Sequence, residues 1–431
     1  MSNFWQKKVA QESAETAGHD DNISNIESPE ENLETQLTEL ASEDAQLDTL
    51  MRDGETLNAD MAKTEDAIDT AADAMDEGEE LSETQAESLE IGQESIRKRW
   101  GITNARVARE SFRNGRGATR IAHESWKDNL KDLWKRLLAF IEQMINKAKD
   151  LKLKVMNVGK SAVSRAKKYE DAIGNMGSKK KKDTISGSWM GKLAIEGNVD
   201  VTKSADIAVD MVSGGKASSA VEAFASQLSA VAAYSVADND GELKFSADGA
   251  AKEFSGEAAK KLKVLPGFEA EGDGEINPHR VYALPGGNYF QSAVKYISGE
   301  GDQKLALMQA SFFSSGEKVE DNDIPTPSSG DLRKANSQLK KIGENYEKVL
   351  KDFRKQDEGI TKLKDAIKKT VDNFDKSKDE DRTHLRNARQ VANGTLVSAQ
   401  NANKAIHTTV RGVLSGLTGY IGAGIGAYEK A

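Results

Sequence analysis

The chain has 431 residues, 70 of them acidic and 60 basic, which gives a formal net charge of −10. At about 150 residues per domain this length allows roughly three domains, so a single compact core is not expected. The chain has no cysteine, which excludes disulfides, thiol catalysis and thiolate metal sites. It also has no apolar stretch of about twenty residues, and its polar start differs from a secretory signal, so we expect neither a membrane anchor nor secretion.

Charge is strongly segregated along the chain. Residues 11–94 carry 27 acidic and two basic side chains, whereas residues 95–182 carry 24 basic and eight acidic ones. Blocks of like charge usually act as solvated or interacting tails. We therefore expect residues 1–124 to form an acidic N-terminal arm that is partly helical and partly disordered.

Apolar residues inside this arm recur at heptad-like spacing, which argues against complete disorder. The pattern is interrupted at Asp44 and resumes after Gly54, so it predicts two amphipathic helices able to pair with partner helices. The first run comprises Leu33, Leu37, Leu40, Leu47 and Met51, and the second Leu57, Met61, Ile68 and Met75.

Residues 125–183 contain the strongest helix signal. Between Trp126 and Leu151 apolar residues recur every three or four positions, and lysines and arginines occupy much of the remainder. This pattern is typical either of a core helix with a basic outer face or of a basic amphipathic helix that binds nucleic acid, a membrane or the chain's own acidic arm. We expect Trp126 and Trp134 to be buried against the following domain.

The basic block ends in Gly174, Gly177 and four consecutive lysines, which predict a flexible, solvated joint. Exposed cations are all that phosphate contact requires, so the block also supplies candidate contacts to nucleic acid or another acidic surface. These candidates are Lys127, Lys131, Lys135, Arg136, Lys179, Lys180, Lys181 and Lys182.

Residues 184–331 are richer in glycine and predict a compact α+β domain with its own core. A buried helix is expected over Ala217–Ala233, a turn at Pro285–Gly287, and a linker over Glu320–Asp331. The expected strands are Lys192–Val201, Arg280–Leu284, Asn288–Ile297 and Lys304–Phe313.

Residues 332–431 return to helical spacing and predict a bundle or coiled coil. Two apolar seams are separated near Asp357–Gly359, and a third helix is expected from His384 onward. The uncharged tail Val413–Tyr428 is expected to be a packed helix, in which the pairs Gly412/Gly416 and Gly422/Gly426 allow close approach. The whole chain is therefore expected to be α+β and mainly helical.

No constellation in the sequence indicates catalysis. The five histidines are scattered without metal-ligand spacing, and no phosphate-binding glycine motif follows a strand. We expect a protein that is not an enzyme, with no cofactor, no metal and no small-molecule substrate.

The segment Ala108–Ile141 resembles one found in internal head proteins of large tailed bacteriophages, the core or inner-body proteins assembled inside the prohead. In that family an ESF element and an Ala/Thr-Arg stretch precede a small-x-Glu site that the prohead protease cuts, and a basic helix with tryptophan follows. Here the ESF element corresponds to Glu110–Phe112 and the Ala/Thr-Arg stretch to Ala118–Arg120. The resemblance implies cleavage after Glu124, with recognition residues Ala122, His123, Glu124 and Ser125.

A cut after Glu124 would invert the charge of the product. Residues 1–124 have a net charge of −17 and residues 125–431 a net charge of +7. We expect a virion protein of the capsid interior, made in the host cytoplasm, whose arm assists assembly and masks the basic helix until it is removed. Expected partners are capsid and prohead proteins, the protease, packaged DNA and further copies of the chain. The alternative is a membrane-active or host-ejected effector that uses the basic helix and the glycine-rich tail.

Overall fold

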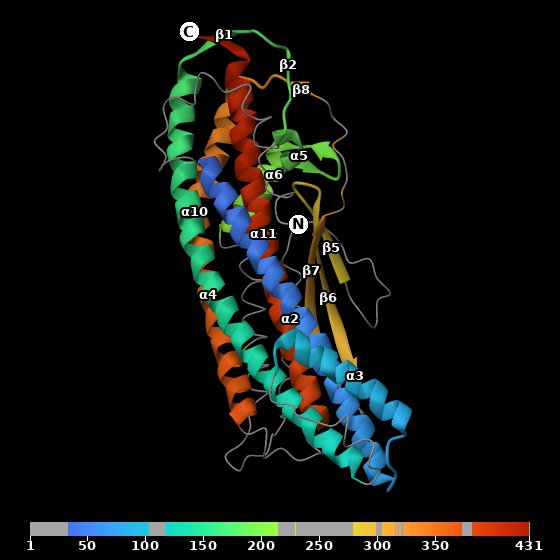
Figure 1. Ribbon diagram of the computed structural model, residues 1–431. Coiled ribbons are helices and arrows are strands. Elements are labelled where there is room, and N and C mark those ends of the chain that lie inside the picture. The colour runs from blue at the N-terminus through green and yellow to red at the C-terminus, as the bar shows by residue number, and fades with distance from the viewer. Residues whose placement is uncertain are drawn as a thin grey trace.

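The computed structural model describes residues 33–102, 117–213, 229, 279–298, 304–314, 316, 319, 323–372 and 382–430. Long helices dominate this part of the chain, with small antiparallel sheets beside them (Figure 1). The protein is therefore mainly helical α+β, as expected. The long helices are α2 (Leu33–Asp76), α4 (Ala118–Gly174), α10 (Ser329–Asp372) and α11 (Arg382–Gly426).

These helices form an antiparallel bundle. Glu43 of α2 meets Lys154 of α4, while Gly54, further along α2, meets Phe140, earlier in α4, so the two helices run in opposite directions. The other neighbouring pairs behave in the same way. Their contacts are Asn336–Ala166 and Asp357–Lys152 for α10 and α4, Tyr346–His407 and Gln356–Asn403 for α10 and α11, and Asp44–Arg411 and Glu65–Arg389 for α2 and α11.

The bundle therefore has a defined order of neighbours. Helix α2 lies between α4 and α11, and α10 lies between the same two helices on the other side. The acidic helix expected in the arm is thus an integral element of the bundle. Helices α4 and α11 each contact α2 along one side.

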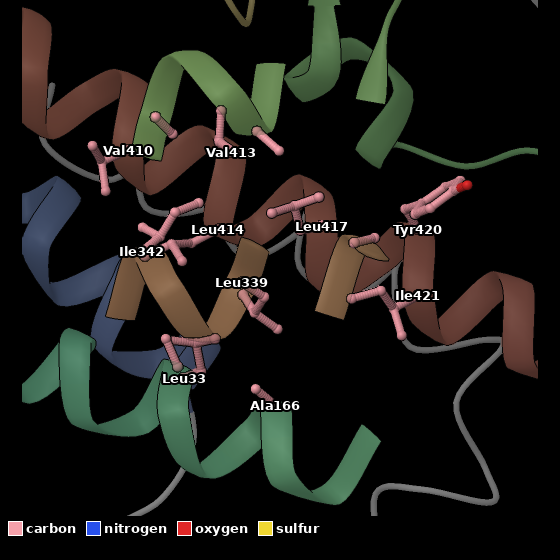
Figure 2. Packing of buried hydrophobic residues seen from close by; sticks show 14 of the residues in the cluster. Leu33, Ala166, Leu339, Ile342, Val410, Val413, Leu414, Leu417, Tyr420 and Ile421 are labelled. Atoms are coloured by element: carbon pink, nitrogen blue, oxygen red, sulfur yellow. The ribbon is translucent and has the colours of Figure 1, made fainter. Parts of the chain in front are cut away.

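Buried apolar side chains form two clusters along the bundle. One gathers Trp126, Trp134 and Ile141 of α4 with Met61 and Ile68 of α2. The other lies at the opposite end and joins residues of α2, α4, α10 and α11, including the labelled side chains of Figure 2. Each large apolar side chain buried in this way contributes about 1.5–3 kcal/mol to folding.

Helix α2 continues through Gly54, so the expected break between two helices at this glycine is wrong. A Cβ at this glycine would lie 2.3 Å from Cζ of Phe140, so its lack of a side chain admits the aromatic ring of α4. Glycine costs about 1 kcal/mol inside a helix, and packing across the helices offsets that cost here. Most of the expected seam is buried, and Asp44, which interrupted it, is buried too.

Helix α10 likewise passes through Asp357–Gly359 without a break, contrary to the expected separation of two seams. Its start is well defined, because Ser328 and Asp331 bond one another's backbone N–H groups in a capping box. The Ser328 hydroxyl also donates to the Asp331 carboxylate at 2.7 Å, and this bond, together with that from the Ser328 N–H, holds the pKa of Asp331 below its usual value. The expected helix from His384 corresponds to α11, which begins at Arg382.

The glycine-rich tail is the packed end of α11. Close approach occurs at Gly416, Gly419 and Gly424, where a Cβ would lie within 2.7 Å of Leu193, Trp189 or Leu332. The glycines expected to serve this purpose do not all do so, since a Cβ at Gly412 or Gly426 would meet nothing within 4 Å. The sequence identified the correct property of the tail but paired the wrong positions.

A three-stranded antiparallel meander lies beside α11 (Figure 1). It consists of β5 (His279–Leu284), β6 (Asn288–Ser298) and β7 (Lys304–Ser314), joined in part by the expected turn, in which Gly286 and Gly287 have positive φ. Asn401 of α11 donates to the carbonyl of Ala310 at 2.8 Å. The three strands expected here are confirmed, and their described buried side chains join the first cluster of the helices.

The fourth expected strand, Lys192–Val201, is largely wrong. The chain there forms α5 (Trp189–Leu193), a hairpin of β3 (Ala194–Ile195) and β4 (Asn198–Val199), and α6 (Val201–Val212). Trp189 packs edge-on against Tyr420 of α11, so α5 covers the glycine-rich end of the bundle. The expected helix Ala217–Ala233 lies outside the described residues except for position 229.

The glycine- and lysine-rich joint is a strand. β1 (Met176–Lys180) pairs with β9 (Tyr428–Lys430), so the prediction of a flexible joint is wrong. A Cβ at Gly177 would lie 2.7 Å from the carbonyl oxygen of Glu429, which explains the glycine. The expected linker before α10 also contains a short strand, β8 (Ile324–Pro325), which pairs with β2 (Thr184–Ile185).

Candidate functional site

The candidate site is the interface that α2 forms with α4 and α11. Helix α2 carries 13 acidic and two basic side chains, α4 carries 13 basic and seven acidic ones, and α11 carries five basic and no acidic ones. Opposite charges therefore face each other on both sides of α2. The sequence predicted the acidic helix and one basic partner, α4, but not the second partner.

Along α11 the acidic side chains of α2 meet a series of cations. Asp44 accepts from Arg411 at 2.6 Å and Asp48 from Lys404 at 2.7 Å. At the other end Arg386 pairs with Asp66 at 3.2 Å and with Asp69 at 2.5 Å. These pairs fix both the direction and the register of the two helices.

The most buried ion pair of this interface joins Arg389 of α11 to Glu65 of α2. The guanidinium donates twice to the carboxylate, at 2.9 Å and 2.6 Å, and also to the backbone carbonyl of Asn58 at 3.0 Å. Arg389 is 1% exposed and Glu65 6%. Such a two-pronged pair is strong and directional, and losing either partner would leave a buried charge uncompensated.

Asp44 is another buried carboxylate of α2. Burial raises its pKa to about 6, and the nearby Arg411 guanidinium opposes that rise. The same end of the interface holds His407, whose Nδ1 lies 3.0 Å from the hydroxyl of Tyr346. Burial lowers the pKa of His407 to about 3, so this histidine is neutral at physiological pH.

Between α2 and α4 the ion pairs lie in the middle of α4. Lys154 pairs with Glu43 at 3.1 Å and with Glu39 at 3.7 Å, and Lys147 pairs with Glu43 at 3.6 Å. These two lysines were recognised as part of the basic helix but were not among its candidate contact residues. The interpretation that α4 binds the chain's own acidic region is confirmed for this face of the helix.

Helix α3 (Glu83–Trp100) closes the interface at the N-terminal end of α4. It starts with a capping box between Ser82 and Gln85. Glu90 of α3 accepts a hydrogen bond from Nε1 of Trp126 at 3.0 Å and forms a buried ion pair with Arg97. Trp126 and Trp134 are buried, as expected, and Trp126 is held by a carboxylate of the acidic region.

The residues expected around the cleavage site lie near the start of α4. The Glu124 side chain is 66% exposed, whereas Ala122, His123 and Ser125 are at least 94% buried. The ESF residues Glu110–Phe112 lie outside the described residues. A protease could reach the Glu124 side chain in this structure but not the backbone of a helix whose neighbouring side chains are packed.

Glu80 caps this end of α4 from the turn between α2 and α3. Its carboxylate accepts hydrogen bonds from the backbone N–H of Gly117 at 2.8 Å and of Thr119 at 3.0 Å, and from the Thr119 hydroxyl. These bonds, the hydroxyl bond above all, lower the pKa of Glu80. The cap matters because Gly117, at the N-cap position, supplies no side chain of its own.

The cations singled out from the sequence fall into two groups. On α4, Lys127 and Lys131 are partly buried, Lys135 pairs with Asp132 at 2.7 Å, and Arg136 is exposed. On β1 and just after it, Lys179–Lys182 are exposed at the far end of the bundle. Lys179 pairs with Glu429 at 3.1 Å, and Lys180 donates to the carbonyl of Thr326 at 3.0 Å. The structure does not bring the two groups together.

Sequence reasoning missed the cations of α11. The signal was present, because Arg389, Lys404 and Arg411 stand among small and apolar residues in a helix without acidic side chains. Asp44 at an apolar position of the heptad pattern was the matching signal on α2. Neither position by itself indicates the residue with which it forms an ion pair.

Among the residues that the structure describes, no cluster of three or more histidine, aspartate or glutamate side chains could hold a metal ion. Within the same residues, no helix is both long and apolar enough to cross a membrane.

Comparison with known proteins gives one family. The family model described as phiKZ-like phage internal head proteins matches residues 42–424, which is most of the chain. No curated protein and no solved structure matches.

Proposed function

Because the chain belongs to the phiKZ-like phage internal head proteins, we propose that it is a precursor whose acidic region, residues 1–124, assists assembly and is removed by the prohead protease. Membership of this family makes the protein a structural component of the virion, located in the capsid interior. The proposal adds a cut after Glu124 and a basic product, residues 125–431, that tolerates or weakly binds packaged DNA. The observation that carries it is the pairing of acidic α2 with basic α4 and α11.

The ion pairs of α2 support a masking role. Arg386, Arg389, Lys404 and Arg411 of α11 and the middle lysines of α4 are neutralised within the chain. Loss of α2 would leave these cations without their carboxylates. Cations with no internal partner can instead neutralise phosphates and release counterions, which favours binding to DNA.

Cleavage after Glu124 requires the first turns of α4 to open. Helix ends open at lower free energy than helix centres, and the segment before Ala118 leads directly into this end. The Glu80 cap opposes that opening. The accessible carboxylate of Glu124 and the small residue two positions before it fit the small-x-Glu pattern of the resemblance.

The contact residues proposed for the cut product are those nearest its new N-terminus, namely Lys127, Lys131, Lys135 and Arg136. The proposed contacts also include Lys179–Lys182 on and after β1. Cleavage would separate Glu80, α2 and α3 from the rest of the chain, and their later release would take away the acidic side chains around the start of α4. Capsid and prohead proteins and further copies of the chain are the proposed assembly partners.

Peptide mapping of the protein from purified particles tests the cut directly. We expect a mature N-terminus at Ser125 and no peptide that spans Glu124–Ser125. Glu124→Gln should leave the chain whole in particles, while Glu196→Gln, at another small-x-Glu triplet, should not change processing. Intact peptides across Glu124 in wild-type particles would overturn the proposed cut.

The Glu80 cap at the start of α4 allows a second test of the proposed cleavage. Glu80→Ala should speed cleavage by purified prohead protease several-fold, because the start of α4 then opens more often. Glu79→Ala is the matched control, since it removes one charge from the same turn but no recorded cap bond. Equal cleavage rates for both variants would show that opening at this end does not limit the cut.

A further inference from the structure

Helices α4 and α10 approach each other unusually closely. A Cβ at Gly159 would lie 2.9 Å from the backbone carbonyl oxygen of Gly343, and a Cβ at Gly343 would lie 2.8 Å from that of Gly159. Both helices run through this point without a break. The two glycines therefore let the helix backbones touch, so that side chains flanking the crossing share one surface.

That surface is basic. Exposed Lys160 and Lys167 lie seven residues apart on α4, and exposed Lys341 and Lys348 lie seven residues apart on α10. Seven residues are about two helical turns and about 10 Å, so each pair lies on one face of its helix. Exposed Arg333 extends the row on α10. Glu344 lies within that row, and exposed Glu170 and Asp171 follow Lys167 on α4.

The antiparallel register places these residues at matching levels along the two helices. Asn336 donates to the carbonyl of Ala166 at 2.8 Å, next to Lys167, and the glycine crossing lies next to Lys160 and Lys341. We call Lys160, Lys167, Arg333, Lys341 and Lys348 the α4–α10 surface. Within the described residues, none of the five takes part in a recorded ion pair.

On the other side of α4, cations are neutralised by carboxylates of the same chain. There Lys147 and Lys154 meet carboxylates of α2, whereas none of the five cations of the α4–α10 surface pairs with a described carboxylate of α2. Holding like charges together on two touching helices costs electrostatic free energy. A polyanionic partner would remove that cost.

We propose that the α4–α10 surface binds the phosphate backbone of double-stranded DNA, and that it does so in the uncut chain. This deepens the DNA contact of the proposed function but does not require cleavage, because the five cations are exposed in the uncut chain. Five cations spread over two helices suit a continuous row of phosphates better than a single phosphate group. Such contacts carry no sequence information, as expected for a protein that meets a whole genome.

The test uses the full chain made without the prohead protease, with binding to a random duplex DNA measured between 50 and 200 mM salt. Each neutralised phosphate contributes about −0.9 to the slope of log affinity against log salt, so five contacts predict a slope of about −4 to −5. The variant K160Q/K167Q/K341Q/K348Q should lose roughly 3 to 4 of that slope.

The matched control is K63Q/K98Q/K362Q/K368Q, which removes the same charge from exposed lysines elsewhere in the chain. In the uncut chain it should keep the wild-type slope. Thermal melting followed by circular dichroism checks that both variants fold, and the first should melt no lower than the wild type because it relieves repulsion.

A wild-type chain that does not bind DNA at 50 mM salt, or a surface variant with an unchanged slope, would overturn the inference. Binding to poly-glutamate but not to DNA would also overturn it, in favour of an acidic protein partner. Its failure is distinguishable from that of the proposed function, because peptide mapping of particles reports the cut and this measurement uses a chain that is never cut.

Discussion

The two faces of helix α4 differ in how their cations are neutralised. Toward α2 it joins an apolar seam, and its lysines there find carboxylates within the chain. Toward α10 it packs through glycines and pairs one lysine, Lys152, with Asp357, but the cations that flank the glycine contact remain on the surface. A basic helix can thus be fully integrated in a fold and still offer charge to a partner. The two faces also differ in what a protease could change, because a cut after Glu124 affects the contact with α2 alone.

The largest effect should come from removing the α2 side altogether. A chain beginning at Ser125 loses the packing of seven large apolar side chains of α2, each worth about 1.5–3 kcal/mol. The sum is on the order of 10–20 kcal/mol, as large as the whole stability of a typical domain, about 5–15 kcal/mol. These side chains are Leu33, Leu37, Leu40, Leu47, Leu57, Met61 and Ile68.

We therefore expect residues 125–431 alone to melt without cooperativity and to bind a hydrophobic dye. Adding residues 1–124 as a separate polypeptide should restore a cooperative melt. A truncated chain that melts like the whole protein would contradict the integral role of α2. The same reasoning implies that the acidic fragment stays bound after a single cut until something else displaces or degrades it.

Breaking the buried ion pair should have the next largest effect. Arg389→Met leaves the Glu65 carboxylate buried without its two-pronged partner, which costs about 3–5 kcal/mol in comparable pairs. Arg386, 3.5 Å from the same carboxylate, should recover part of this, so we expect the lower end of that range. Urea unfolding measures the loss.

Arg386→Met, one turn away on α11, is the control for this pair. Its side chain is 32% exposed and its closer pairs are with the exposed carboxylates of Asp66 and Asp69, so its loss should cost at most about 1 kcal/mol. Equal losses for the two variants would show that burial of Arg389 does not set the strength of this contact.

The close contact between α4 and α10 can be disrupted at its glycines. Gly343→Ala places a methyl group against a backbone carbonyl that cannot move aside, and should destabilise the chain by about 1–3 kcal/mol. Gly412→Ala, where a Cβ meets nothing within 4 Å, should instead stabilise α11 by about 0.5–1 kcal/mol. Thermal melts of the two variants should shift in opposite directions. A Gly343→Ala chain as stable as the wild type would show that the helices do not need this close approach.

The last prediction concerns pH and the α2 side. Because burial raises the pKa of Asp44 from 3.8 to about 6, the folded chain binds this proton more tightly than the unfolded chain. Stability from this group is therefore greatest below pH 4 and falls as the pH rises through 6, by about 2–3 kcal/mol at most.

Asp44→Asn removes this titration. The difference in unfolding free energy between wild type and variant should change between pH 4 and pH 7, with the wild type losing relative stability as the pH rises. Taking the difference cancels the titration of the many other carboxylates. A difference that stays constant over this range would mean that the Asp44 carboxylate is charged throughout.

Much of the local structure followed from the sequence. The apolar spacing of residues 33–75, the Trp126–Leu151 helix and the three strands of the meander were all predictable from periodicity and turn residues. The errors were at glycines and charges. From the sequence, regular secondary structure is expected to break at Gly54, Gly177 and Asp357–Gly359. A sequence pattern reports only intrinsic propensity, and tertiary packing overrides that propensity at these positions.

The candidate site was predictable in part. Segregated charge predicted an acidic region able to mask a basic helix, and the residues from Ala108 to Ile141 indicated the family that the wider match to residues 42–424 supports. The basic partners on α11 were not predictable, because Arg389 and Glu65 are separated by more than 300 residues and nothing local links them.

The sequence by itself therefore determined the sign of the net charge of each segment, the apolar stripe of each helix and the family. Charge and periodicity are local properties, and they survive any arrangement of the helices. Which carboxylate meets which cation, and which lysines stay on the surface, was decided by the antiparallel order of the bundle. That order depends on contacts between residues far apart in the chain, such as Gly159 with Gly343, where the absence of a side chain has meaning only once the facing helix is in place.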